Sequence, residues 1–161
     1  MDERFMKEAL AEAKLAAAMG EVPVGAVIVR NGEIVARAHN TRETEKNALH
    51  HAEILAIDAA CRALGGWRLT DCTLYVTLEP CPMCGGAILN SRIGRVVYGA
   101  KDASMGVFGS VLNYNAYPLG YKPQVTHGVL SEESRALMQG FFESARERKK
   151  QNGKNTQEKP L

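Results

Sequence analysis

Cysteine is scarce in this sequence, with only four residues in 161. A chain of this length is expected to form one domain and to bury about 70% of its unfolded surface, so it needs no disulfide bonds to be stable. The first twenty residues contain several charges and no long apolar run, which argues against a signal peptide or a membrane span there. We therefore expect a cytoplasmic protein whose reduced cysteines serve metal or redox chemistry.

Net charge is also small, at +2 over the whole chain. Its distribution is uneven, because residues 144–161 contain six basic and two acidic residues, a local balance of +4. The rest of the sequence is therefore slightly acidic, at −2. A basic segment of this kind is either a solvated terminus or an electrostatic contact for nucleic acid, and the sequence leaves both interpretations open.

Internal repeats are absent, and hydrophobic periodicity divides the chain into alternating helices and strands. Residues 2–19 have the apolar spacing of one helix face, and the run stops at Gly20. Two β-branched runs follow, joined by Asn31-Gly32, the strongest short signal for a hairpin. Beyond the hairpin we expect helices from about His51, Pro80 and Ser131, and strands at residues 72–78, 95–100 and 122–130. This order predicts an α/β domain with a mixed sheet covered by helices.

Metal-binding residue types gather at two of the predicted junctions. One is "HHAE", from His50 to Glu53, and the other is "PCPMC", which contains Cys81 and Cys84. The two cysteines are three residues apart in the first turn of a helix, so both sulfurs can face one point. The free N–H groups at that position favour the thiolate form. Two cysteines and one histidine make a three-ligand zinc site, which keeps its fourth position for water and so indicates catalysis.

Glu53 indicates which chemistry such a site supports. Residues two apart point about 200° away from each other in a regular helix, so His51 and Glu53 can act together only at a helix start. One of them can then bind zinc while the other reaches the attacking water, whose pKa zinc lowers to about 7. His51 has the two-residue offset and is the preferred ligand, but the residues alone leave His50 open.

The cysteine pair also allows other interpretations. A lone Cys-x-x-Cys motif is typical of thioredoxin-like redox sites and of half a zinc ribbon. Redox chemistry does not account for the His-x-Glu motif, and a ribbon needs a second pair that neither Cys61 nor Cys72 provides. We expect those two cysteines to be small buried hydrophobic residues. A non-catalytic zinc module would have no use for Glu53, so the combined motifs favour an enzyme.

The combination of His51-Ala52-Glu53 with Pro80-Cys81-Pro82-Met83-Cys84 resembles the signature of the zinc-dependent nucleoside and nucleobase deaminases. Segments such as "EVPVGAVIV", "AHNTR" and "GFFESARERKK" extend the resemblance to the bacterial tRNA-specific adenosine deaminases, from residue 5 to about residue 150. The resemblance implies a three-layer α/β/α, cytidine-deaminase-like domain with a five-stranded mixed sheet in residues 1–150. The polar segment 151–161 has no counterpart there, and its composition predicts disorder.

The resemblance also implies roles for individual residues. The ligands His51, Cys81 and Cys84 would hold one zinc ion per subunit. Glu53 would move protons while water adds to C6 of a flipped-out adenine and ammonia leaves. Substrate contacts are implied for four more residues: Asn40 at the base, Asp102 near a ribose 2′-hydroxyl, Phe142 by stacking and Arg146 at a phosphate.

The substrate that the resemblance implies is adenosine at the wobble position of an arginine tRNA, which hydrolytic deamination converts to inosine. The basic terminal segment accords with this substrate, because single-stranded RNA loops are bound by aromatic and basic side chains. The family is homodimeric, so we expect a homodimer, and we expect no membrane partner. The zinc motif is shared with deaminases of free nucleobases or nucleosides, such as guanine or cytosine, and such an enzyme is the alternative.

Overall fold

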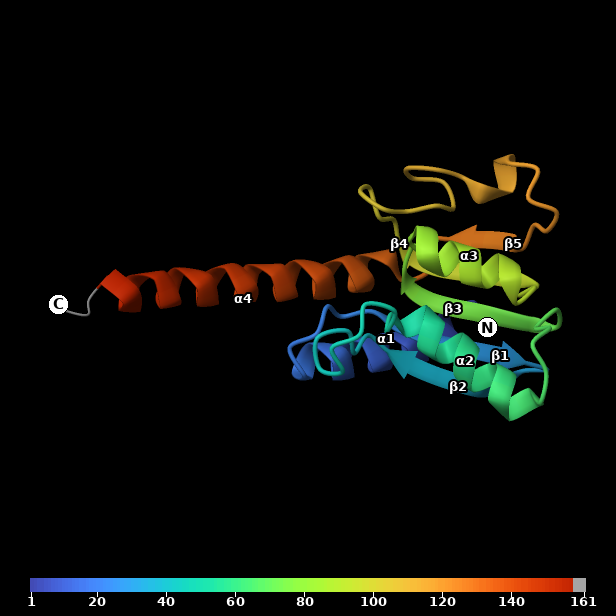
Figure 1. The fold of residues 1–161 in the computed structure, drawn as a ribbon, viewed down its shortest axis with the longest axis horizontal. Coiled ribbons are helices and arrows are strands. Elements are labelled where there is room, and N and C mark those ends of the chain that lie inside the picture. Colours follow the sequence, from blue (N-terminus) through green and yellow to red (C-terminus); the bar gives the residue numbers. More distant parts are fainter. Residues whose placement is uncertain (158–161) are drawn as a thin grey trace.

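Five strands form one sheet in the computed structural model, which describes residues 1–157. They are β1 (Gly25–Arg30), β2 (Glu33–His39), β3 (Cys72–Leu78), β4 (Arg95–Ala100) and β5 (Gln124–His127). Their order across the sheet is β2-β1-β3-β4-β5 (Figure 1). Strand β1 is antiparallel to both of its neighbours, whereas β3, β4 and β5 run parallel. The sheet is therefore mixed, as predicted.

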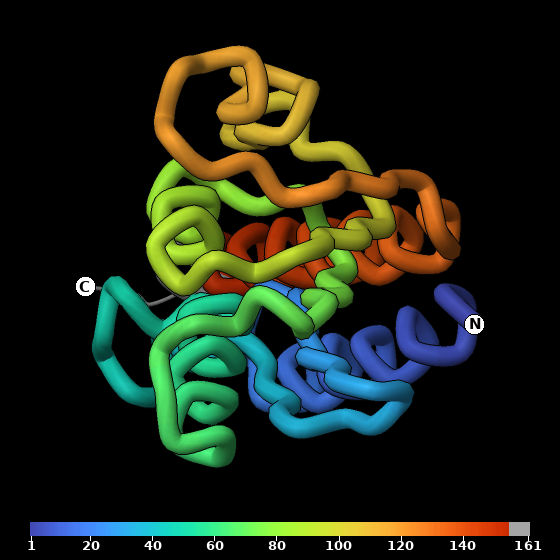
Figure 2. The backbone as a smooth tube through the Cα atoms, turned by 90° about the vertical axis from the view of Figure 1, so that its right-hand side faces the viewer, coloured from blue at the N-terminus to red at the C-terminus, as the bar shows by residue number. Residues whose placement is uncertain are grey.

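Helices cover both faces of this sheet. Helices α2 (Ala52–Leu64) and α3 (Pro82–Asn90) pack on one face, and α1 (Asp2–Ala18) and α4 (Ser131–Gln157) pack on the other (Figure 2). A short 3-10 helix, η1 (Tyr114–Ala116), lies in the connection between β4 and β5. The arrangement confirms the predicted three-layer α/β/α fold.

The two apolar cores follow the alternation of side chains along the central strands. On β3, Leu74 and Val76 face the core under α2 and α3, while Tyr75 belongs to the core under α1. Each fully buried side chain of this kind contributes about 1.5–3 kcal/mol. Because helices cover both faces, the central strands read in the sequence as nearly continuous apolar runs.

The predicted hairpin is present between β1 and β2. Asn31 and Gly32 both have positive φ angles, 51° and 77°, as a two-residue type I′ turn requires. Asparagine and glycine adopt this backbone conformation at low cost, which is why the dipeptide identified the turn in the sequence. The last strand differs from its prediction, because β5 is shorter than residues 122–130 and ends before Gly128, whose φ of 83° leaves the extended region.

Helix α4 is 27 residues long, and its C-terminal half projects beyond the rest of the molecule (Figure 1). Helix α4 therefore includes residues 151–157, whereas the composition predicts disorder from residue 151, and residues 158–161 lie outside the described part. The helix continues because residues 144–150 are mostly strong helix formers and no proline follows until Pro160. None of the helices in the described part of the chain has the length and apolar character needed to cross a membrane.

Candidate active site

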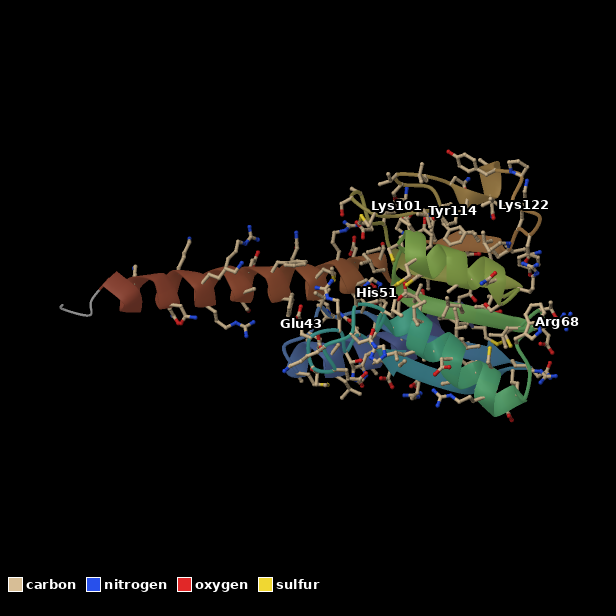
Figure 3. The ribbon with its side chains drawn as sticks, in the orientation of Figure 1. Glu43, His51, Arg68, Lys101, Tyr114 and Lys122 are labelled. Atoms are coloured by element: carbon tan, nitrogen blue, oxygen red, sulfur yellow. The ribbon has the colours of Figure 1, made fainter. Side chains whose placement is uncertain are left out.

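The residues of the two motifs meet where α2 and α3 begin. His51 is the N-cap of α2 and Cys81 is the N-cap of α3, and both have extended backbone conformations. Cys84 lies in the first turn of α3 and is fully buried. Figure 3 shows His51 at the end of the layer where α2 starts. N-cap side chains lie beside the free N–H groups of the first turn, so the two helix starts bring the three side chains to one point.

The three potential ligands are already close enough to share one metal ion. The Nδ1 atom of His51 lies 3.6 Å from the Sγ of Cys81 and 3.4 Å from the Sγ of Cys84. A tetrahedral zinc ion with ordinary Zn–N and Zn–S distances separates such a nitrogen and sulfur by about 3.5 Å. His51, Cys81 and Cys84 are the metal-type group found in the described residues, and their geometry and chemistry fit a zinc site.

The cysteines differ in the proton that each holds. Hydrogen bonds from the Cys84 thiol and from His51 lower the pKa of Cys81 to about 4. The pKa of Cys84 is raised, first by its hydrogen bond to Cys81 and then by burial. The pKa of His51 is raised by its hydrogen bond to Cys81. A bound cation would favour the thiolate form of both cysteines.

Glu53 is the buried acid of the site, with 4% of its surface exposed. Burial raises the pKa of this carboxyl group, because a low dielectric disfavours the charged form. Its position in the first turn of α2 places it two residues after the potential ligand His51. A carboxyl group of raised pKa is suited to accept and deliver a proton near neutral pH.

The site opens into a cavity of about 490 Å³, a volume within the range of small-molecule binding sites. His51, Glu53 and Cys81 line its floor. Its other walls include the segment before β1, the loop after β2, the loop after β4 and part of α4. The predicted substrate contacts Asn40, Asp102 and Phe142 all line this cavity.

Comparison with known proteins identifies the family. A model of the MafB19-like deaminase family matches residues 1–146. The chain belongs to this deaminase family. A tRNA-specific adenosine deaminase from Bacillus subtilis (strain 168) is 52% identical to the present deaminase over 158 residues, which is 98% of each chain. The resemblance found from the motifs is therefore confirmed.

Solved structures of related deaminases share the fold. One from a study of A-to-I editing by tRNA:A34 deaminases has a TM-score of 0.81 and 42% identity, and the match covers 83% of this deaminase and 98% of that chain. An X-ray structure of guanine deaminase from Bacillus subtilis has a TM-score of 0.60 and 36% identity, covering 77% and 85% of the two chains. Relatives with the same fold therefore include an RNA editor and a free-base deaminase.

Two predicted contacts of the deaminase already have internal hydrogen bonds. The side-chain amide of Asn40 donates to the Val22 carbonyl at 3.3 Å, and its oxygen accepts from the Arg42 amide at 3.1 Å. These bonds fix the orientation of the amide and leave one N–H and one lone pair for a ligand. One carboxylate oxygen of Asp102 accepts the backbone N–H groups of Ser104 and Met105, so this acid shapes its own loop.

The remaining predicted residues divide between the cavity and its surroundings. Phe142 borders both the cavity and a second hollow on α4, and Arg146 lines only that second hollow. His50 pairs with Glu45 and is not part of the metal-type group. Cys72 is buried and Cys61 is half-buried against the same core. The role expected for these two cysteines as small hydrophobic residues is in keeping with that packing.

Sequence reasoning missed several residues around the cavity of the deaminase. Three cationic side chains, Arg42, Lys101 and Arg135, line it from three separate segments. Two acids, Glu21 and Glu79, are buried nearby with only 1% and 2% of their surface exposed. The position of Glu79 at the end of an apolar strand, directly before "PCPMC", was the available signal, because a lone acid in such a run requires hydrogen-bond partners.

Proposed function

We propose that this deaminase hydrolyses adenosine to inosine at the wobble position of a tRNA anticodon, with an arginine tRNA as the substrate. The observation that carries the proposal is the group His51, Cys81 and Cys84 beside the buried acid Glu53 in one cavity. The names of the tRNA-specific relatives and of the tRNA:A34 deaminase structure support the choice of substrate.

The chain's own residues account for the proton transfers of this reaction. Zinc held by His51, Cys81 and Cys84 would lower the pKa of the attacking water. Glu53 takes a proton from that water at a carboxylate oxygen and delivers it to N1 of the adenine as the water oxygen bonds to C6. It then takes the remaining hydroxyl proton and delivers it to the C6 amino group, so that the C–N bond breaks, ammonia leaves and the C6 carbonyl forms. Burial favours neutral Glu53 and a nearby cation favours the ionised form, so the group can exchange protons in both directions. Asn40 then offers its remaining N–H and lone pair to the base.

An RNA loop suits the walls of the cavity. Three cationic side chains, Arg42, Lys101 and Arg135, line the cavity. Phe142, which also lines it, is 45% exposed. An unpaired base avoids most of the few kcal/mol that extrusion from a duplex costs. The chain also presents Arg146 and Lys149 on the hollow that adjoins Phe142. Aromatic stacking combined with phosphate contacts is how proteins hold single-stranded RNA.

We also propose that the enzyme is a cytoplasmic homodimer. The family resemblance is the main support for this. Exposed apolar side chains offer surface that a second subunit could cover, among them Leu49, Val111 and Leu112, which are 57%, 51% and 42% exposed. Light scattering coupled to size-exclusion chromatography measures the mass of the particle, and a monomer at micromolar concentration would contradict the proposal.

Incubation of the zinc-loaded enzyme with total tRNA, followed by sequencing, tests the substrate. We expect adenosine to be converted to inosine at the wobble position, and no product in the matched Glu53→Ala reaction. Free adenosine, guanine and cytosine are assayed in parallel, because the guanine deaminase fold match favours a free base as the second candidate. Conversion of a free base without conversion of tRNA would replace the proposed substrate.

A further inference from the structure

Glu79 is a buried carboxylate that the proposed reaction does not use. It follows the last residue of β3 and stands two residues before Cys81. No lysine, arginine or histidine among the described residues forms an ion pair with it. A buried acid without a cation requires strong hydrogen-bond donors from elsewhere.

All of the donors to Glu79 come from one loop. Its Oε1 atom accepts the backbone N–H of Asp102 at 3.2 Å and the hydroxyl of Ser110. Its Oε2 atom accepts the N–H groups of Phe108 and Ser110, at 3.0 and 3.2 Å. Both oxygens act as acceptors in these four bonds, so one side chain is tied to three residues of the loop.

This loop, residues 101–113, is a wall of the cavity. Residues 101–105 line the cavity directly, and Glu79 lies behind them with 2% of its surface exposed. Glu79 also borders the cavity on its inner side. The carboxylate therefore connects the strand that leads to Cys81 with the wall that a bound nucleotide would touch.

The loop approaches the carboxyl group so closely at Gly106 that any larger residue there would force one of the two to move. A Cβ atom added to Gly106 would lie 2.3 Å from the Cδ of Glu79. The next residue, Val107, donates its N–H to the Pro80 carbonyl at 3.1 Å. Val107 and Phe108 are also buried in the core, so the far end of the loop keeps its apolar anchor when the carboxylate is altered.

We propose that Glu79 is a positioning residue for the RNA substrate, holding residues 101–105 at the distance from the metal site that the target nucleotide requires. This inference rests on the proposed function for its substrate. Glu79 acts through the loop and not on the proton transfer, so its loss affects substrate binding more than the chemical step. Asp102, whose backbone N–H it accepts, is the loop residue that depends on it most directly.

The substitution Glu79→Gln tests the anchor, because the isosteric amide turns an N–H group toward N–H donors. Amide hydrogen exchange of Phe108 and Ser110 is expected to accelerate by about tenfold or more, because N–H groups of the loop would then face another donor instead of an acceptor. The KM for an anticodon stem-loop RNA is expected to rise by about tenfold, with a smaller change in kcat. Bound zinc should be unchanged.

A double-mutant cycle separates positioning from a general loss of stability. If Glu79 acts through the loop, the double variant Glu79→Gln/Asp102→Ala should raise KM by less than the product of the two single increases. The reason is that Glu79→Gln already displaces Asp102 from the substrate, so removing the Asp102 side chain has little further effect. Glu12→Gln is the matched control, since Glu12 is another buried acid but pairs with Arg37 and His39 away from the loop. It should leave the exchange of Ser110 unaltered.

Two further variants keep the test decisive if Glu79→Gln does not fold. Ser110→Ala removes only the hydroxyl donor, and Gly106→Ala displaces the loop from its own side. Both should raise KM in the same direction. Unchanged exchange and KM in all three variants would overturn the proposal, as would fully multiplicative effects with Asp102→Ala. A wild-type enzyme that is inactive on tRNA would refute the proposed function. The contact between Glu79 and the loop could still be tested in that case, because amide exchange needs no substrate.

Discussion

The Nδ1 atom of His51 lies 3.4 Å from the Sγ of Cys84, although 33 residues separate the two in the chain. They meet because α2 and α3 pack side by side on one face of the sheet and begin at the same end of it. The fold therefore brings together three side chains that could hold one metal ion, and preorganisation of this kind reduces the entropy that binding costs.

Replacing Glu53 should separate metal binding from catalysis. Glu53→Ala removes the proton carrier but none of the three ligands, so we expect a loss of about 10²- to 10⁴-fold in kcat with zinc content unchanged. Inosine formation and metal analysis of the same sample measure the two effects. Asp58→Ala changes an exposed acid on the same helix and should retain activity. Full activity in metal-replete Glu53→Ala would refute the role.

Removal of the metal should abolish activity and lower stability together. A chelator is expected to eliminate deamination, and added zinc to restore it. If zinc binds only the folded state, a free zinc concentration of about a hundred times its Kd stabilises that state by about 2.7 kcal/mol. Thermal unfolding measures this stabilisation as an increase in Tm. Cys84→Ala should lose this zinc response, whereas Cys61→Ala, at a half-buried cysteine outside the group, should keep it. A chelated enzyme with full activity would exclude metal chemistry.

The two sides of α4 should contribute differently to RNA binding. Arg146 shares a hollow with Phe142 and Lys149, whereas Arg148 lines a different hollow that includes Lys14 of α1. Arg146→Ala should weaken binding and reduce the log–log salt slope by about 0.7, the value for one phosphate on single-stranded RNA. Phe142→Ala should cost about 1–3 kcal/mol through lost stacking.

Arg148→Ala is the matched control for this prediction, because it removes the same charge from the same helix. Its salt slope should stay close to that of the wild type when a fluorescent stem-loop is titrated at several salt concentrations. Equal slopes for Arg146→Ala and Arg148→Ala would show that net charge, and not the position of the arginine, determines binding.

Asp2 should make stability depend on acidic pH. Its carboxylate accepts two hydrogen bonds from Arg95, at 2.9 and 2.7 Å, and these lower the pKa of Asp2. A lowered pKa means that the stabilisation is present above the unfolded value of about 3.9 and is lost as pH falls through the folded value. Asp2→Asn should therefore cost about 1 kcal/mol at pH 7, and less as the pH falls below 4.

Urea unfolding at pH 7 and pH 3 measures this difference. Asp58→Asn removes an exposed ion pair with Arg62 and should cost less than about 0.5 kcal/mol at pH 7. An equal loss for Asp2→Asn at both pH values would show that the side chain acts through packing and not through its charge.

Much of the fold could be predicted from local patterns. The bounds of β3 and β4 agree with the predicted strands, and Asn31-Gly32 identified the hairpin, because side-chain periodicity and turn chemistry depend on neighbouring residues. The end of α4 could not be predicted in the same way. Polar composition after residue 151 indicated disorder, while helix propagation from the preceding turns extends to Gln157.

The sequence by itself determined the types of ligand, their place at two helix starts and the acid that accompanies them, because those features depend on spacing within short segments. Only the tertiary structure decided that His51 and not His50 joins the cysteines, and that Arg146 lies outside the cavity. It alone also revealed Glu79 beneath the loop after β4. These relationships depend on how distant segments pack, and no local pattern in a single sequence contains that information.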